Sequence, residues 1–170
     1  MFELKDLPSR ETLETFAKRY RNPDVEGLQL WLMWASSTNE MLSAFTDQLA
    51  IHGLTQAKFF VLLLLLRNPS GLSIAALAEG VNVTSPTMTR IIDRMETAAL
   101  CVREQDTVDR RAWVVRIAKD GEAVMAQAIP DHYTWVAELM NHFDVDERNQ
   151  IRHLMNKLNK ATQAVGAVIA

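Results

Sequence analysis

Apolar residues recur at intervals of three and four along most of the chain, the spacing that places them on one face of an α-helix. Most of these runs follow a serine, threonine or aspartate, the residue types that most often cap a helix N-terminus. The pattern therefore predicts a mainly helical protein. The expected helices cover residues 10–20, 24 to about 50, 56–67, 74–80, 85–98, 121 to about 142 and 144 to about 168, with Ser9, Asp24, Thr55, Ser73 and Thr84 as caps.

The longest apolar run extends from Phe59 to Leu66. It is far shorter than the ~20 residues that a membrane-spanning helix needs, so we interpret it as a fully buried helix and expect no membrane contact. The N-terminal residues do not show a charged leader followed by an apolar segment, so we expect no signal peptide.

One region departs from the helical pattern. Residues 101–105 (CVREQ) and 112–117 (AWVVRI) are rich in strand-forming residues, and they flank the polar tip DTVDRR at 106–111. The two helices before this region, 74–80 and 85–98, are separated by the short stretch GVNV, which predicts a helix-turn-helix. A helix-turn-helix followed by a projecting hairpin is a winged helix. The predicted fold class is all-α with a small β-hairpin.

Composition and charge narrow the functional classes. The chain has 170 residues, of which 48% are hydrophobic and 23% charged, as in a globular protein. It has one cysteine, so no intrachain disulfide can form and a reducing cytoplasm is the expected setting. The net charge of −3 argues mildly against nucleic acid. Residues 84–119, however, hold seven basic and five acidic residues, so this segment carries a net charge of +2.

The helix at 85–98 has an apolar stripe, and its other faces carry small hydroxyl and basic side chains near the N-terminus. A recognition helix presents such side chains to base edges in a DNA major groove. We therefore expect Arg90 and Arg94 to anchor phosphates or read bases. The alternative is an ordinary solvated face on which Asp93 and Glu96 pair with these arginines. The expected DNA contacts on this helix are Ser85, Pro86, Thr87, Thr89, Arg90 and Arg94.

Residues 53–121 resemble the MarR family of transcriptional regulators. The resemblance is carried by GLTQAKFFVLLLL, LSIAALAEGVNVTSPTMTRIIDRME, REQDTVDRRAWVVRI and KDG. It implies a homodimer in which N- and C-terminal helices interleave, and two winged helices that bind a pseudo-palindromic operator in double-stranded DNA. The implied organisation is dimerisation helices at 1–54 and 120–170 around a DNA-binding domain at 55–119. The implied function is a repressor released by a small aromatic or lipophilic ligand.

The tip residues acquire roles through this resemblance. Asp109 would orient an arginine and stabilise the wing, Arg111 would enter a flanking minor groove, and Arg110 would contact a phosphate. A narrow A·T-rich minor groove has a strongly negative potential that favours arginine. The alternative is that Asp109 pairs with an arginine and only stiffens the turn, an interaction worth about 0–1 kcal/mol when exposed.

Two positions depart from the family pattern. Ala99 stands where the family commonly has glycine, and Ala118 stands where a threonine usually caps the next helix. A left-handed alanine costs on the order of 1 kcal/mol, as does a lost cap. Both residues lie at the joints of the wing.

The family binds effectors between its dimerisation helices and the winged helix. Large aromatic and methionine side chains with a few polar groups suit such a site, although ordinary core and dimer packing also explains them. The candidates for the pocket are Trp34, Thr38, Met41, His132 and Trp135.

Other chemistries have weaker sequence support. The chain lacks the glycine-rich and nucleophile motifs of common enzymes, so we expect no catalytic site and no cofactor. Its four histidines lack metal-ligand spacing, so we expect no metal site. Cys101 lies two residues from Arg103, which could lower the thiol pKa. A redox- or metal-responsive regulator therefore stays open as an alternative, as does a protein-interaction winged helix that does not bind DNA.

Overall fold

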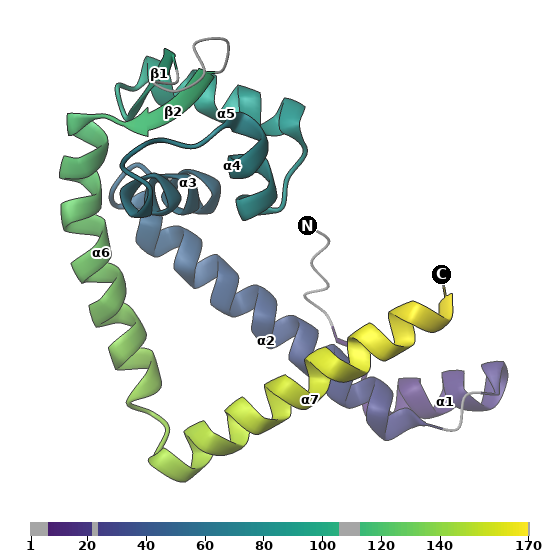
Figure 1. The fold of residues 1–170 in the computed structure, drawn as a ribbon. Coiled ribbons are helices and arrows are strands. Elements are labelled where there is room, and N and C mark those ends of the chain that lie inside the picture. The colour runs from purple at the N-terminus through teal and green to yellow at the C-terminus, as the bar shows by residue number, and fades with distance from the viewer. Residues whose placement is uncertain (1–6, 22–23, 106–112, 170) are drawn as a thin grey trace. The chain divides into compact units, whose positions relative to one another are not determined.

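Figure 1 shows the computed structural model of the chain, in which residues 7–21, 24–105 and 113–169 are described. The elements are α1 (Arg10–Tyr20), α2 (Val25–Ala50), α3 (Gln56–Arg67), α4 (Ile74–Val81), α5 (Ser85–Thr97), β1 (Cys101–Gln105), β2 (Trp113–Ile117), α6 (Lys119–Met140) and α7 (Val145–Ile169). The chain forms two compact units, Met1–Met125 and Ala126–Ala170. The predicted class, all-α with a small hairpin, is confirmed.

The first five helices begin where their capping residues predict. In each case the side-chain oxygen of the cap accepts a hydrogen bond from the backbone N–H three residues later, which satisfies one of the unpaired donors of the first turn. The caps are Ser9, Asp24, Thr55, Ser73 and Thr84. Helix α7 begins with a reciprocal pair, because Asp144 and Glu147 each accept the other's backbone N–H at 2.9 Å.

Among the described residues, a residue in the left-handed conformation follows four helices, and Arg21 is the one after α1. After α2, α4 and α5 this residue belongs to a Schellman motif with its paired backbone hydrogen bonds. Gly53 fills this position after α2 and Asn82 fills it after α4, and both residue types tolerate it. Ala99 fills it after α5, with φ 56°. Its N–H donates to the Glu96 carbonyl, and the Leu100 N–H donates to the Met95 carbonyl at 2.9 Å. The position at which the family commonly has glycine is therefore left-handed in this chain, with alanine in it.

The core of the first unit lies around α3 and includes side chains from α2, α4, α5, both strands and the start of α6. The largest of its fully buried side chains are Leu49, Leu62, Leu65, Leu77, Met88, Ile92, Met95 and Met125. Helix α3 is not buried on every side, because Phe60 is 40% exposed. The expectation of a fully buried helix therefore needs correction: one flank of α3 remains open within the single chain.

The hairpin pairs β1 with β2 in antiparallel register, from Cys101 opposite Ile117 to Gln105 opposite Trp113. The free edge of β2 pairs in turn with Leu72, whose N–H and carbonyl bond to Val115 at 3.0 and 2.8 Å. This third segment joins the hairpin to the loop before α4. Arg116 strengthens the joint, since its guanidinium donates to the Pro69 carbonyl at 2.9 Å.

Helix α6 begins at Lys119, two residues earlier than the sequence predicted. Ala118 occupies the capping position without a side chain that can accept a hydrogen bond. Its N–H instead donates to the Leu100 carbonyl at 3.1 Å. Asp120 and Glu122 in the first turn favour the helix start electrostatically. Gly121 passes so close to the Leu100 carbonyl that a Cβ there would lie 2.2 Å from the oxygen. The helix start therefore packs directly on the base of the wing.

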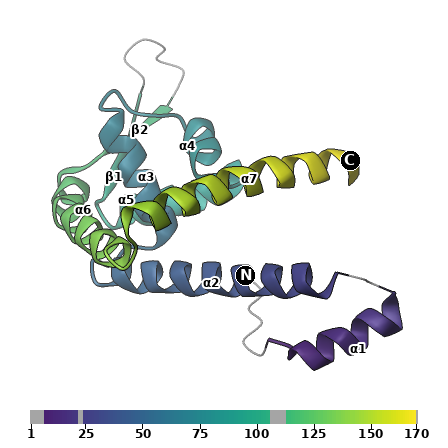
Figure 2. The same cartoon turned by 90° about the horizontal axis from the view of Figure 1, so that it is seen from below.

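The outer helices expose much apolar surface in the single chain. Helix α1 packs on the first turns of α2 (Figure 2), yet Phe16 remains 46% exposed and Trp31 62% exposed. On α7, described by itself, Leu154 is 55% exposed and Val165 60% exposed. No helix among the described residues is both long enough and apolar enough to span a bilayer.

The left-handed alanine yields a stability prediction. Ala99→Gly relieves a backbone strain of about 1–2 kcal/mol, partly offset by the greater unfolded-state entropy of glycine. We expect a net stabilisation of about 0.5–1 kcal/mol, or a Tm increase of about 2 °C, measured by thermal unfolding at fixed protein concentration.

The matched control is the neighbouring Ala98→Gly. Ala98 has φ −87°, which alanine adopts without strain, so glycine there is expected to lower the Tm or leave it unchanged. A Tm decrease for Ala99→Gly equal to that for Ala98→Gly would contradict the interpretation.

Candidate nucleic-acid interface

Helices α4 and α5 form the predicted helix-turn-helix, with Asn82 rather than Gly80 supplying the left-handed residue of the turn. The orientation of α5 follows from its apolar stripe. Met88, Ile92 and Met95 are completely buried, so the opposite face of the helix points to solvent. This exposed face carries Ser85, Pro86, Thr87, Arg90 and Arg94, while Thr89 is half-buried.

The hydroxyl groups near the start of α5 are partly used within the helix. Thr84 accepts the Thr87 N–H, and the two hydroxyls lie 2.9 Å apart. The Thr89 hydroxyl donates to the Ser85 carbonyl at 3.0 Å, which leaves its oxygen able to accept. The first backbone N–H groups of a helix have no intrahelical partner and carry a partial positive charge, so this end suits an anion such as a phosphate.

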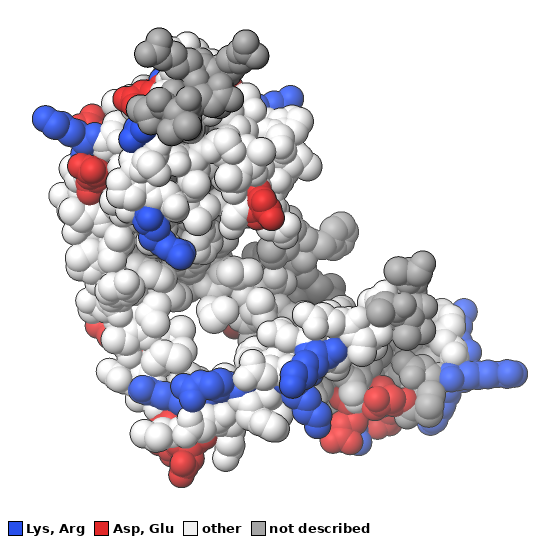
Figure 3. All heavy atoms as spheres, viewed as in Figure 1, with Lys and Arg blue, Asp and Glu red and all other residues white. Residues whose placement is uncertain are grey.

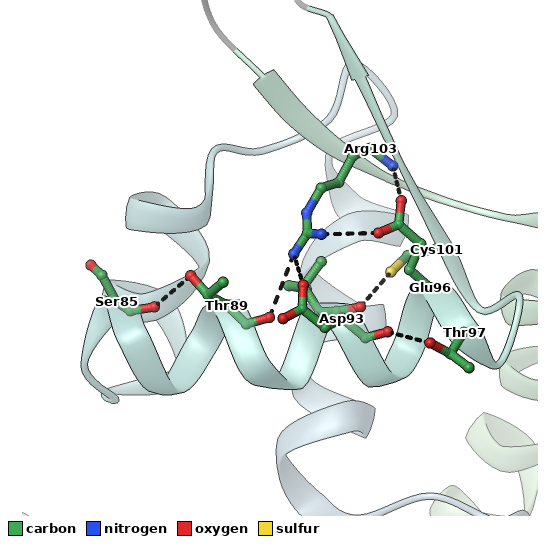
Figure 4. A network of polar contacts seen from close by, with 8 residues as sticks. Ser85, Thr89, Asp93, Glu96, Thr97, Cys101 and Arg103 are labelled. Carbon is green, nitrogen blue, oxygen red and sulfur yellow. Dashed lines mark hydrogen bonds and ion pairs between the residues drawn. The ribbon is translucent and has the colours of Figure 1, made fainter.

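The acids of α5 do not pair with the arginines of α5. Both Asp93 and Glu96 bind Arg103 of β1, with N···O distances of 2.5 and 3.0 Å (Figure 4). Within the described residues, Arg90 and Arg94 take part in no ion pair. The alternative in which these acids neutralise Arg90 and Arg94 is therefore wrong. The exposed face of α5 keeps two uncompensated positive charges.

The sequence did not predict the contacts of Arg103. We name the group formed by Arg103, Asp93, Glu96 and the Thr89 carbonyl the Arg103 network. Arg103 on β1 lies seven to fourteen residues after the other three members, which all belong to α5. A strand residue and a helix residue at such separations have no fixed spatial relation in sequence, so only the packing of β1 on α5 brings them together.

Charged side chains do not form one continuous patch on the face shown in Figure 3, where basic and acidic groups are scattered among uncharged atoms.

Asp109, Arg110 and Arg111 lie in residues 106–112, outside the described residues. The strands that lead to the tip end at the cross-strand pair Gln105 and Trp113. The roles expected for the three tip residues stay predictions.

The Cys101 thiol has no feature of a reactive cysteine. The residue is completely buried, and its Sγ lies 4.0 Å from the Ile92 carbonyl oxygen. Burial, followed by the negative charge of Glu96, raises the pKa of Cys101 to about 11, and the opposing effect of Arg103 is smaller. Arg103 does lower this thiol pKa, as expected, but burial and the charge of Glu96 outweigh it, so the pKa rises overall.

The five candidate pocket residues lie on two helices. Trp34 and Thr38 are half-buried on α2, and Met41 on the same helix is 47% exposed. In the second unit, the His132 ring stacks on Trp135 with centroids 5.9 Å apart. Burial lowers the pKa of His132 below its ordinary value, which favours the neutral imidazole. A pocket formed jointly by the two helices stays a prediction.

A different depression, of about 430 Å³, lies between the C-terminal half of α2 and residues 55–57. Gln56 fixes this corner, since its side-chain amide donates to the Leu42 carbonyl at 3.0 Å and to the Thr46 hydroxyl at 2.7 Å. None of the five candidate pocket residues lines it. In the part of the chain that is described, no group of three or more histidine, cysteine or acidic residues is arranged to hold a metal ion.

The chain is similar in sequence to known transcriptional regulators. A sequence profile of the MarR family matches residues 54–113. The chain is 27% identical over 157 residues to the transcriptional repressor YetL of Bacillus subtilis, covering 92% of this chain and 94% of YetL. It is 30% identical over 105 residues to the transcriptional regulator HosA of Escherichia coli, covering 62% of this chain and 77% of HosA.

Solved structures agree with these relatives. The repressor CouR bound to a 23-mer DNA duplex superposes with a TM-score of 0.69 at 25% identity, covering 81% of this chain and 96% of CouR. CouR from Rhodococcus jostii RHA1 bound to p-coumaroyl-CoA superposes with a TM-score of 0.64 at 19% identity, covering 76% of this chain and 90% of CouR.

The environment of Cys101 generates a reactivity prediction. With a pKa of about 11, only on the order of one thiol in a thousand is ionised at pH 8, and the sulfur is buried as well. A thiol-reactive disulfide reagent is expected to leave the folded protein unmodified at pH 8 and to modify one thiol per chain in guanidinium chloride. Fast modification of the folded protein at pH 8, monitored by mass spectrometry, would contradict this burial and reopen the redox alternative.

Proposed function

This chain belongs to the MarR family of transcriptional regulators, and on that premise we propose that it is a dimeric, sequence-specific repressor released from its operator by a small ligand. The coarser function follows from the family: the chain is a DNA-binding transcriptional regulator and not an enzyme. In the finer proposal, residues 55–119 bind DNA, and residues 1–54 and 120–170 form the dimer. The protein acts in the cytoplasm.

The single observation that carries the DNA contact is the exposed face of α5. Arg90 and Arg94 lie there opposite the buried stripe, and the acids beside them are bound elsewhere. In the proposed complex α5 enters the major groove, where these arginines anchor phosphates or read base edges. Ser85 and Thr87 donate to phosphates or bases, Thr89 accepts from a base amino group through the oxygen that its bond to the Ser85 carbonyl leaves free, and Pro86 contacts a thymine methyl group.

The wing extends this interface to the flanking minor groove. In the proposal, Arg111 enters the groove, Arg110 contacts a phosphate and Asp109 orients one arginine. The register of β1 and β2 supports the proposal, because the paired strands lead toward both ends of the tip segment.

A homodimer explains the apolar surface that a single chain leaves exposed. A monomer rarely leaves many large apolar side chains of a helix exposed, and such surfaces mark association sites. Here α1, α2 and α7 each expose several. A twofold dimer presents two copies of α5, which suits a pseudo-palindromic operator with half-sites about one helical turn, ~34 Å, apart.

The proposed effector is a small aromatic or lipophilic molecule. The p-coumaroyl-CoA bound to CouR gives a precedent on the same fold. In this chain the stacked pair of His132 and Trp135 offers an aromatic surface with an uncharged polar edge, and Trp34, Thr38 and Met41 are the candidates on α2. An effector releases DNA only by the difference in its affinity for the free and DNA-bound conformations.

The DNA-binding proposal predicts specific, salt-dependent binding to a duplex from the promoter of the chain's own gene. We expect the dissociation constant to increase steeply between 50 and 200 mM salt, because binding releases counterions from the phosphates. Arg90→Ala and Arg94→Ala are each expected to weaken binding by about tenfold, which corresponds to about 1.4 kcal/mol, measured by fluorescence anisotropy.

The control is Arg152→Ala, which removes the same charge from α7 and is expected to leave the affinity unchanged. If wild type ignores both this duplex and total genomic fragments at low salt, the protein-interaction alternative replaces the proposal.

The dimer proposal predicts that a charge on the apolar face of α7 separates the subunits. Leu154→Glu is expected to shift the sedimenting species from dimer to monomer, since it buries an unpaired charge in the interface. Gln163→Glu adds the same charge to the opposite face of α7 and is expected to leave the dimer intact. A wild-type chain that sediments as a monomer at micromolar concentration would refute the dimer.

A further inference from the structure

The side of β1 that faces α5 carries Cys101 and Arg103, because side chains alternate along a strand. Cys101 is completely buried, and the Arg103 side chain is only 25% exposed. Val102 and Glu104 lie on the other side of the strand and are exposed. Gln105, the last residue of the strand, is also exposed. Arg103 is therefore the outermost residue of β1 that is held against α5 before the tip begins.

Arg103 is held by both its backbone and its side chain (Figure 4). Its main-chain N–H donates to one oxygen of Glu96 and its Nη1 donates to the other, each at 3.0 Å. Its Nη2 donates to Asp93 at 2.5 Å and approaches the Thr89 carbonyl at 3.5 Å. A planar guanidinium with several fixed donors is suited to join two carboxylates in one geometry.

The hairpin needs such an attachment. A two-stranded hairpin is marginally stable by itself. Strand β2 is attached to the loop before α4, through its pairing with Leu72 and the hydrogen bond from Arg116 to the Pro69 carbonyl. The packing of Cys101 and the Arg103 network attach β1 to α5. The orientation of the hairpin relative to α5 therefore depends on contacts that end at Arg103.

We propose that Arg103 is a positioning residue that, through Asp93 and Glu96, sets the orientation of the wing relative to helix α5 and so determines the preference for operator over unrelated DNA. The inference rests on the proposed function as an operator-binding regulator. Arg103 itself does not contact DNA in this account, because its Nη1 and Nη2 groups are held by Glu96, Asp93 and the Thr89 carbonyl.

Removing the acids of the network separates positioning from simple electrostatics. Asp93 and Glu96 are negative charges on a helix that approaches phosphates, so their removal by itself would strengthen binding to any DNA. If they position the wing through Arg103, their removal instead weakens operator binding. The two accounts predict opposite signs for the same variants.

The experiment measures the affinities of Asp93→Asn and Glu96→Gln for the promoter duplex and for a scrambled duplex of equal length. We expect operator binding to weaken by roughly five- to tenfold and scrambled-duplex binding to stay equal or strengthen, so that the specificity ratio falls. The matched control is Glu79→Gln on α4, an exposed acid outside the network, which is expected to leave the ratio unchanged.

A second measurement needs no DNA. Amide hydrogen exchange of the free protein is expected to accelerate in the segment 101–105 for Arg103→Ala and Glu96→Gln, but not for Glu79→Gln. Arg103→Lys keeps the charge but loses the forked geometry, so we expect it to restore part of the operator affinity that Arg103→Ala loses. A Tm measurement of each variant shows that it is folded.

The outcomes distinguish this inference from the proposed function. If wild type binds the operator and Asp93→Asn and Glu96→Gln bind it equally well or more tightly, the positioning role is refuted and the function stands. If wild type does not bind the operator at all, the function fails, whatever the exchange of segment 101–105 shows.

Discussion

Most of the surface of helix α3 is buried against neighbouring elements, and the arrangement of the winged helix depends on that burial. It contacts α2, α4, α5 and β2, and Phe59, Val61, Leu62 and Leu65 are at most 3% exposed. Each such side chain contributes about 1.5–3 kcal/mol relative to an exposed one. Rotating α5 would expose its own buried stripe, so packing around the core leaves only one face of α5 available to DNA.

Polar contacts then fix the position of the wing relative to α5, which apolar packing alone does not determine. Backbone hydrogen bonds close the turn at Ala99 and join Ala118 to Leu100, so both joints of the wing are held by main-chain contacts in a chain that lacks the glycine and threonine usual in the family. The Arg103 network attaches β1 to α5. It also pairs Asp93 and Glu96 with Arg103, so these acids do not pair with Arg90 and Arg94. One ion-pair group thus affects both the shape and the charge of the proposed interface.

Much of the fold could be predicted because its signals are local. A capping side chain acts on an N–H three residues away, and an apolar stripe repeats within two turns, so helix positions can be read directly from neighbouring residues. The errors have the same explanation. The start of α6 was placed two residues late, because the bond from Ala118 to Leu100 joins residues far apart in sequence.

The sequence by itself determined the helix order, the winged helix, the family and the residues on the exposed face of α5. Only the tertiary structure decided which charges are available. Asp93 and Glu96 lie close to Arg90 and Arg94 in sequence, yet they bind Arg103. The packing of β1 on α5 that allows this also buries Cys101 and raises its pKa. Charge pairing and desolvation depend on distances between elements, and sequence spacing does not specify those distances until the core has packed.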